Sequence, residues 1–189
     1  MDFGIGTIFL ILLVIVAGYV IFAYNGLVRA RQVVREAWSG IDVQLKRRAD
    51  LIPNLIETVK GYASHERKTL EEVTELRTRA QNLPRDDVAG RAQAEGLLSQ
   101  ALGRLFAVAE AYPDLKANQN FMQLQTSLET LESEIQMSRR YYNGAARDLN
   151  IKVESFPSNL VANAFSFRQA EYFEIDNPDD RATPKVSFS

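Results

Sequence analysis

The sequence predicts an all-α protein: an N-terminal transmembrane helix followed by an antiparallel four-helix bundle with long helices. Residues 3–24 form an almost unbroken apolar block, and no side chain from Phe3 to Val28 carries a charge. Beyond this block, apolar residues recur every three or four positions, which is typical of helices packed on one face. The alternation with period two that half-buried strands show is missing, so a helical fold is expected throughout.

The apolar block is long enough to cross a bilayer. At about 1.5 Å per residue it spans roughly 33 Å, which exceeds the roughly 30 Å hydrocarbon core. A cleaved signal peptide is the alternative, but Asp2 replaces the usual basic start and no A-x-A pattern precedes Asn25. We therefore expect an uncleaved anchor over residues 1–26, with Tyr19 and Tyr24 in an interfacial aromatic belt.

The flanking charges predict how the anchor is oriented. Asp2 lies on the short side, and Arg29, Arg31 and Arg35 follow the apolar block. The positive-inside rule places the N-terminus outside and the bundle in the cytoplasm, which suits a chain without cysteine. Because the three arginines lie within about 12 Å of the end of the block, we expect them to contact lipid phosphates.

Four helical segments are predicted for the bundle, residues 27–153. The first has an apolar stripe of Leu27, Ala30, Val34, Trp38, Ile41, Leu45 and Ile52. The second follows Pro53 and runs from Leu55 to Ala80. Pro84 ends it, and Asp86 or Asp87 can cap the third, which ends at Tyr112 before a turn at residues 113–114. The fourth runs from Phe121 to Leu149, with a repeat close to 3.5 residues that favours a shallow packing angle.

The stretch VQLKRRADLIPNL places Lys46, Arg47 and Arg48 shortly before Pro53. They would lie about 30 Å beyond the bilayer, against a Debye length of about 8 Å, so lipid cannot be their partner. We expect carboxylates of the same bundle, of a neighbouring copy or of another protein. Pro53 should end or kink the helix, so the cluster is either an ordinary charged C-terminal turn or a docking surface, for example for the acidic residues 171–180 of another subunit.

Residues 154–189 form an aromatic segment followed by an acidic tail. Pro157 and Ser158 can start and cap a short helix, and the final residues read as extended. One hypothesis is that the aromatic side chains fold back over the open end of the bundle. The other is an exposed patch for a partner or a membrane, with protein contacts expected at Phe165, Phe167, Tyr172 and Phe173.

The sequence contains no motif that is typical of a catalytic or metal-binding site. The single histidine, His65, lies in HERKT rather than HExxH, and Tyr62 stands where a Glu-x-x-His metal site needs glutamate. No nucleophile motif, Walker loop or dinucleotide fingerprint occurs. We predict no catalytic, cofactor or metal site and no enzyme activity, and the net charge of −2 gives no support to nucleic-acid binding.

Several stretches together resemble the LemA family: the run from Tyr24 to Glu66, AYPDLKANQNF, RRYYNGAARDLN, and the closing FPSNLVANAFSF, AEYFE and PKVSF. The resemblance implies a bacterial membrane protein with one N-terminal span and a four-helix bundle, placed in the inner membrane. It implies no established catalysis. Some relatives take part in forming magnetosome membranes, which suggests membrane organisation by analogy.

Three hypotheses for function follow. The first is a non-enzymatic scaffold that is bound to the lipid bilayer, self-assembles as a homo-oligomer and organises or shapes the bacterial membrane. The second is an adaptor that presents the aromatic segment to another membrane protein, such as a protease or sensor kinase. The third and weakest is a metal-dependent or other hydrolase.

Overall fold

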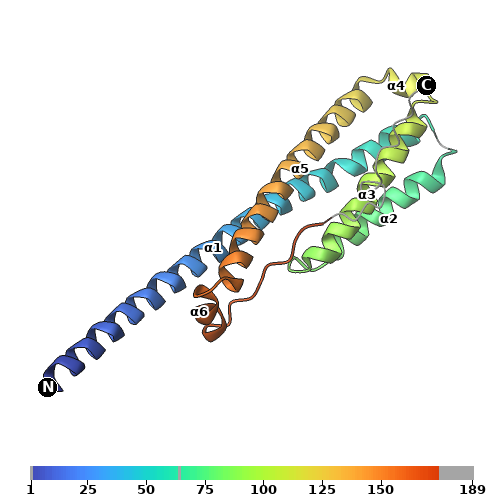
Figure 1. The fold of residues 1–189 in the computed structure, drawn as a ribbon. Coiled ribbons are helices and arrows are strands. Elements are labelled where there is room, and N and C mark those ends of the chain that lie inside the picture. The colour runs from blue at the N-terminus through green and yellow to red at the C-terminus, as the bar shows by residue number, and fades with distance from the viewer. Residues whose placement is uncertain (1, 64, 175–189) are drawn as a thin grey trace, which may run out of the picture. The chain divides into compact units, whose positions relative to one another are not determined.

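The structure is a computed structural model that describes residues 2–63 and 65–174 (Figure 1). All regular secondary structure within those ranges is helical, which confirms the predicted all-α class. The helices are α1 (Asp2–Lys60), α2 (Arg67–Asn82), α3 (Val88–Ala109), α4 (Pro113–Lys116), α5 (Gln119–Glu154) and α6 (Ser158–Ala164). The acidic tail predicted beyond residue 174 lies outside the described residues.

The described residues divide into two compact units, which share the long helices α1 and α5. The first unit contains residues 2–40 and 140–171. The second contains residues 41–63, 65–139 and 172–174. The sequence predicts a different division, into a transmembrane anchor (1–26), a helical bundle (27–153) and a C-terminal segment (154–189). That division concerns the membrane, whereas the two units are defined by contacts within the chain, so it stays a prediction.

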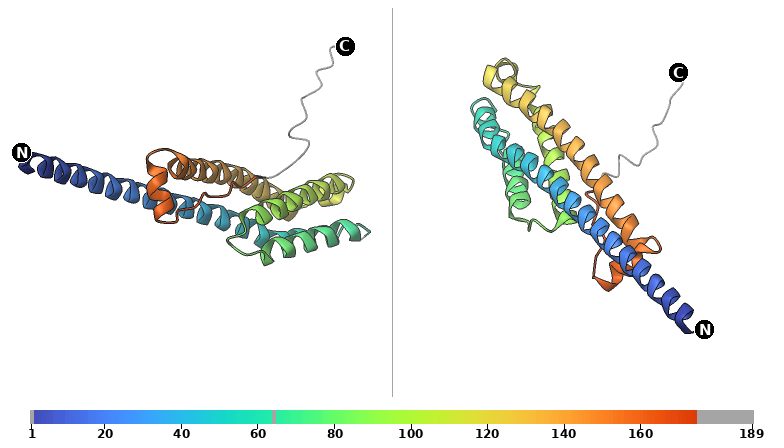
Figure 2. Two further views of the ribbon diagram at one scale, coloured as in Figure 1. Left: turned by 60° about the horizontal axis from the view of Figure 1, so that its bottom comes forward. Right: turned by 90° about the vertical axis from the view of Figure 1, so that its left-hand side faces the viewer.

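The second unit has an apolar core to which α1, α2, α3 and α5 all contribute. In Figure 2, α2 and α3 lie side by side. Burial recurs at helical intervals, because 3.6 residues per turn bring every third or fourth side chain to the same face. Each fully buried Val, Leu or Phe side chain contributes about 1.5–3 kcal/mol. The core includes Ile52, Leu55, Val59, Leu70, Val73, Leu98, Ala101, Leu105, Leu115, Phe121 and Leu128.

Helix α1 continues through Pro53 to Lys60, so the prediction that a new helix starts after Pro53 is wrong. A proline has no N–H, and the carbonyl four residues earlier in the helix, that of Ala49, therefore loses its helical donor. Arg77 on α2 donates its Nε–H to the Ala49 carbonyl at 2.7 Å. This contact between helices replaces the missing backbone bond and compensates for the proline.

The break between the first two helices lies at residues 61–66. The amide of Ala63 donates to the Val59 carbonyl at 2.8 Å and closes the last turn of α1. Gly61 follows the helix directly, and glycine is the poorest helix former after proline. Tyr62, predicted to lie on the apolar stripe of the second helix, is therefore in this connection and is 44 % exposed.

Asp87 caps α3 as predicted, because its side chain accepts the backbone N–H of Gly90 at 2.8 Å. A Cβ on Gly90 would lie 2.2 Å from a carboxylate oxygen of Asp87, so a larger residue there would require the Asp87 side chain to shift. Helix α3 ends at Ala109, slightly before the predicted end at Tyr112. The predicted turn at residues 113–114 is the start of the short helix α4.

The first unit combines the N-terminal part of α1 with the C-terminal part of α5 and with α6. Trp38 is half-buried, with its ring 5.4 Å from that of Tyr142, and Ala37 takes the fully buried position beside it. The short helix predicted after Pro157 is α6, but Ser158 does not cap it: its hydroxyl donates to the Lys152 carbonyl at 2.7 Å instead. The buried apolar residues of the first unit include Ala23, Leu27, Ala30, Val34, Ala37, Tyr142, Ala145, Ala146, Leu149, Val161, Ala162 and Phe167.

Candidate functional site

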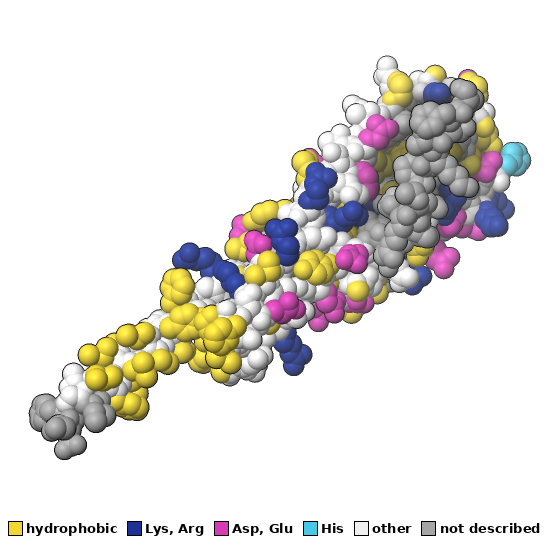
Figure 3. All heavy atoms as spheres, in the orientation of Figure 1, with side chains coloured by type: hydrophobic (Ala, Val, Ile, Leu, Met, Phe, Trp, Pro, Cys, Tyr) yellow, Lys and Arg dark blue, Asp and Glu magenta, His cyan; other side chains and the backbone are white. Residues whose placement is uncertain are grey.

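The N-terminal part of α1 presents an apolar surface. Every side chain from Ile8 to Val16 is more than half exposed, and Figure 3 shows hydrophobic side chains gathered along this end of the helix. The most apolar 18-residue stretch of α1 is only 6 % buried, whereas the core helix of a soluble protein would be mostly buried. By length and composition α1 can cross a membrane, a criterion that a signal sequence near an N-terminus also meets.

The three arginines after the apolar block differ in their surroundings. Arg29 and Arg35 are exposed, while Arg31 is half-buried. The guanidinium carbon of Arg31 lies 4.9 Å from the ring centre of Phe167, a cation–π contact within the first unit. Arg31 is thus directed at an aromatic ring of its own chain, and the predicted contact of these arginines with lipid stays a prediction.

Arg48 lies at the centre of a buried charge network in the second unit. The residue is 1 % exposed, and its guanidinium donates to Glu95 Oε2 at 2.5 Å and to Glu132 Oε2 at 2.6 Å. It also donates to the hydroxyl of Ser99 at 2.6 Å. A buried cation requires paired and hydrogen-bonded partners, and α3 and α5 supply them here. We call Arg48, Glu95, Ser99 and Glu132 the Arg48 network.

The neighbouring cations meet carboxylates with more water around them. Arg47 donates to Glu134 Oε2 at 3.2 Å, and its side chain is 59 % exposed. Lys46 is also exposed. The predicted partners of Lys46, Arg47 and Arg48 were carboxylates of the same bundle, of a neighbouring copy or of another protein. For Arg47 and Arg48 the structure shows carboxylates of the same chain. Lys46 and Arg47 remain accessible for a further contact, and Arg48 does not.

A second charged pair lies on the same part of α1. Arg91 on α3 is 8 % exposed and donates to Asp42 Oδ1 at 2.7 Å. Functional roles for Arg91, Glu95 and Asp42 were not predicted from the sequence, although the spacing of Arg91 and Glu95 along α3 indicates that these two side chains are buried. Arg91 and Glu95 precede Leu98 by seven and three residues, on the same helix face, so two charges occupy an apolar stripe.

The four aromatic residues predicted as contacts divide evenly between buried and exposed. Phe167 is 7 % exposed in the first unit and Phe173 is fully buried in the second. Phe165 is 52 % exposed and Tyr172 is 39 % exposed. Folding back therefore describes Phe167 and Phe173, whereas Phe165 and Tyr172 are the two of these four residues that a partner could reach.

Two polar side chains of α5 hold the segment that follows α6. Asn150 donates to the Ala170 carbonyl at 2.9 Å and accepts the Ala170 N–H at 2.7 Å. The hydroxyl of Tyr142 donates to the Glu171 carbonyl at 2.8 Å. Burial, together with the nearby Glu171 charge, raises the pKa of Tyr142 to about 12. Both residues occur in RRYYNGAARDLN, one of the stretches that resemble the family.

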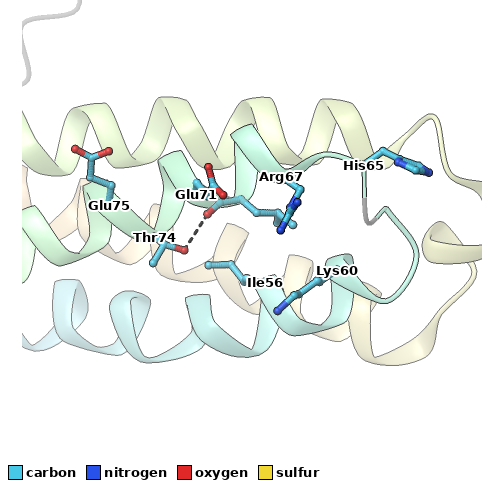
Figure 4. A pocket seen from close by; sticks show the side chains of 8 residues that line it. Ile56, Lys60, His65, Arg67, Glu71, Thr74 and Glu75 are labelled. Atoms are coloured by element: carbon cyan, nitrogen blue, oxygen red, sulfur yellow. Dashed lines mark hydrogen bonds between the residues drawn. The ribbon is translucent and has the colours of Figure 1, made fainter.

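A groove of the second unit lies between the end of α1 and α2, with a volume of about 810 Å³ (Figure 4). Ile56 and Leu70 give it an apolar floor, and it carries charges of both signs. His65, at one end, points away from Thr74, whose hydroxyl donates to the carbonyl of Leu70 at 2.8 Å. Its described lining therefore offers no nucleophile with an adjacent base. The charged lining residues are Lys60, His65, Arg67, Glu71 and Glu75.

The carboxylates of residues 2–63 and 65–174 do not gather into a metal centre. In the part of the chain that the structure describes, no group of three His, Cys, Asp or Glu side chains could hold a metal ion. The carboxylates that do converge, Glu95 and Glu132, share the cation Arg48. The described sites present charged side chains and apolar surface.

Comparison with known proteins gives consistent matches over most of the chain. Protein LemA of Metamycoplasma hominis is 28 % identical over 170 residues, which cover 88 % of this chain and 77 % of the relative. Magnetosome protein MamQ of Magnetospirillum gryphiswaldense is 25 % identical over 189 residues, covering 86 % and 70 %. Magnetosome protein MamQ 2 of Paramagnetospirillum magneticum is 27 % identical over 175 residues, covering 80 % of this chain but 64 % of the relative.

A family model described as "LemA family" matches residues 37–188, which contain the Arg48 network, the Tyr142 and Asn150 contacts and the aromatic segment. The match begins after the apolar block of α1, so it rests on the helices beyond that block and not on general apolar character. The resemblance seen in the sequence is confirmed, and the chain belongs to the LemA family.

Proposed function

We propose that this protein is a non-enzymatic helical scaffold, anchored in a bacterial membrane by the N-terminal part of α1, that self-assembles to organise or shape that membrane. The observation that carries the proposal is the exposed apolar surface of α1, which 6 % burial leaves without a cover inside its own chain. A continuous apolar surface that is exposed over many residues marks contact with a membrane or a protein. A length sufficient to span a bilayer favours the membrane.

The proposed arrangement places residues 1–26 in the inner membrane, with the N-terminus outside. The rest of the chain then lies in the cytoplasm, because Arg29, Arg31 and Arg35 follow the span. Residues 27–153 are proposed to act as an antiparallel four-helix bundle of α1, α2, α3 and α5, followed by the segment 154–189. The lipid bilayer and further copies of the chain are the proposed partners.

Self-assembly is supported by the charges that remain accessible on α1. Lys46 and Arg47 are exposed, and the pair of Arg47 with Glu134 has side chains that are 59 % and 34 % exposed. Such solvated pairs contribute about 0–1 kcal/mol, so Arg47 can exchange its partner for a carboxylate of another copy at little cost. Arg48 is excluded from this role by its burial.

The test of assembly is the mass of the full-length protein in mild detergent, measured by light scattering after size exclusion. A discrete particle of several copies is expected for the natural chain, and a smaller one for a variant carrying Lys46→Glu and Arg47→Glu. A variant with Lys68→Glu and Arg79→Glu makes the same charge change on exposed positions of α2 and should keep the large particle. A monomeric natural chain, or equal effects of the two variants, would refute assembly through this surface.

Anchoring is tested separately in cells. The protein should stay with the membrane fraction after alkaline carbonate extraction, and its intact mass should include the residues of the apolar block. Loss of that block from the purified chain would identify it as a cleaved signal sequence. Release by carbonate of an intact chain would show that α1 does not span the bilayer.

An adaptor is the second candidate, and a groove at the aromatic segment favours it. The groove has a volume of about 440 Å³ and is lined by α3 together with Tyr172 and Glu174, all within the second unit. Tyr172 is the accessible aromatic side chain there, at 39 % exposure. If this groove receives another membrane protein, Tyr172→Ala should remove a specific crosslink in cells and leave the particle mass unchanged. Loss of self-association in that variant would contradict the adaptor.

A further inference from the structure

Helix α6 and the residues directly before and after it expose large apolar side chains in the first unit. Phe156 is 79 % exposed, Leu160 is 61 % exposed and Phe165 is 52 % exposed. We call these three residues the α6 corner. Figure 3 shows hydrophobic side chains gathered over α6 and the adjoining part of α1. The opposite side of α6 is buried through Val161 and Ala162, so the helix is fixed to its unit and the corner is not needed for that packing.

The α6 corner lies at the level where the apolar block of α1 ends. The ring of Tyr24, the last residue of that block, meets the ring of Phe165 with the centroids 4.9 Å apart. The ammonium of Lys152 lies 3.4 Å from the Gly26 carbonyl and donates to it. Figures 1 and 2 show α6 beside α1 in all three views. All of these residues belong to the same unit.

We propose that the α6 corner inserts into the headgroup region of the lipid bilayer and gives the protein a second membrane contact beside the span. The inference rests on the proposed function, because it takes the end of the apolar block as the membrane surface. Phenylalanine and leucine form the apolar face of helices that lie in a membrane interface, and the amphipathic ring of Tyr24 beside the corner favours the same depth. An apolar surface continuous with a span meets lipid as soon as the span is inserted.

The charges around the corner fit the same partner. Arg29, Lys152 and Arg168 are exposed and belong to the first unit. Cations beside an inserted apolar edge attract anionic headgroups, by about 1 kcal/mol each when they lie at the surface of such a membrane. Glu154 is the exposed acid nearest in sequence, and the amide of Gln169 donates to it at 2.5 Å. Exposed apolar side chains combined with exposed cations are typical of helices that lie in a membrane interface.

The test uses tryptophan as a depth reporter in the full-length chain. The natural Trp38 is first replaced by phenylalanine, and Phe156→Trp or Leu160→Trp is then added, with helix content checked by circular dichroism. The protein is reconstituted into phosphatidylcholine and phosphatidylglycerol vesicles that contain lipids brominated either near the headgroup end or near the terminal methyl of the acyl chain. Fluorescence of both reporters should be quenched strongly by bromine near the headgroup and weakly by bromine near the methyl end.

Two controls use the same unit. Tyr19→Trp lies within the apolar block and should be quenched whenever the span is inserted. Tyr141 is 58 % exposed, which is similar to the residues of the corner. Its neighbour Tyr142 packs on Trp38, and Trp38 follows Tyr24 by fourteen residues, or about 21 Å along α1. Tyr141→Trp therefore reports on a position well beyond the end of the apolar block. Bromine at either depth should leave it unquenched.

The outcomes separate the two proposals. If Tyr19→Trp is not quenched, the span is not in the bilayer and the proposed function fails. If Tyr19→Trp is quenched while Phe156→Trp and Leu160→Trp behave like Tyr141→Trp, the anchor stands and the inference about the corner is overturned. The corner would then be an accessible surface for a protein.

Discussion

Replacing Arg48 by alanine removes the cation that two carboxylates share. Glu95 has a side chain that is 6 % exposed, so its charge would be left buried without a partner. Glu132 has a side chain that is 36 % exposed and can turn toward water. Removing one member of a buried pair costs about 3–5 kcal/mol, and the partial exposure of Glu132 places the expected loss near the lower end.

The neighbouring arginine supplies a matched control. Arg47→Ala makes the same chemical change one residue earlier, but the pair of Arg47 with Glu134 is exposed, and such pairs are worth about 0–1 kcal/mol. Urea unfolding of the full-length protein in detergent, followed by far-ultraviolet circular dichroism, measures both losses. With a slope of about 1–3 kcal/mol per M, a loss of about 3 kcal/mol for Arg48→Ala should lower the midpoint by roughly 1–3 M, and Arg47→Ala should lower it by about a third of that or less.

A double variant tests the reason for the loss. Arg48→Met together with Glu95→Leu removes both buried charges and replaces them with apolar side chains of similar length. This should recover most of the stability, because the cost in the single variant comes from the unpaired carboxylate and not from a missing attraction. Equal midpoints for Arg47→Ala and Arg48→Ala would refute the reasoning, as would a double variant less stable than Arg48→Ala.

Three further outcomes are expected from the same unfolding measurement. Arg77→Met should cost about 1–3 kcal/mol, since the carbonyl of Ala49 loses the donor that replaces the proline amide; no loss would show that this bond is dispensable. Asp87→Ala should cost about 1 kcal/mol through loss of the helix cap, and an unchanged midpoint would contradict the cap. For Tyr142, whose pKa is raised from 10.0 to about 12, the phenol contributes its full stability below about pH 10 and loses it as the pH rises toward 12. The natural chain should therefore lose stability across that window more steeply than Tyr142→Phe, and parallel profiles would exclude Tyr142 as the titrating group.

The spacing of apolar residues was sufficient to predict the long helices. Leu27, Ile41 and Leu45 are buried as the stripe of the first helix requires, and Phe121 to Leu149 does lie within one helix, α5. The cap at Asp87 was readable because acid, spacing and the preceding proline are local signals. These features depend on residues within a turn or two of one another, which is what a single sequence expresses directly.

The errors have a common physical origin in contacts between distant residues. Pro53 was read as a helix end because the donor that compensates for it, Arg77, lies in another helix. Arg48 was read as one of three equivalent cations, although it follows Leu45 by three residues and precedes Ile52 by four, on the buried face. Its helical phase could have identified it. Its partners Glu95 and Glu132 could not be identified, because nothing local relates one helix to another.

The Arg48 network also limits how the helices of the second unit can slide. Apolar stripes with a repeat near seven residues would still match after a shift of one heptad, because leucines and isoleucines would meet equivalent side chains. Such a shift of α1 would bring Ile41 or Leu55 to the position of Arg48. Glu95 would then face an aliphatic side chain in a site closed to water, at a cost of several kcal/mol. One charged residue thus fixes the alignment of α1 against α3 and α5, which the apolar stripes alone leave open.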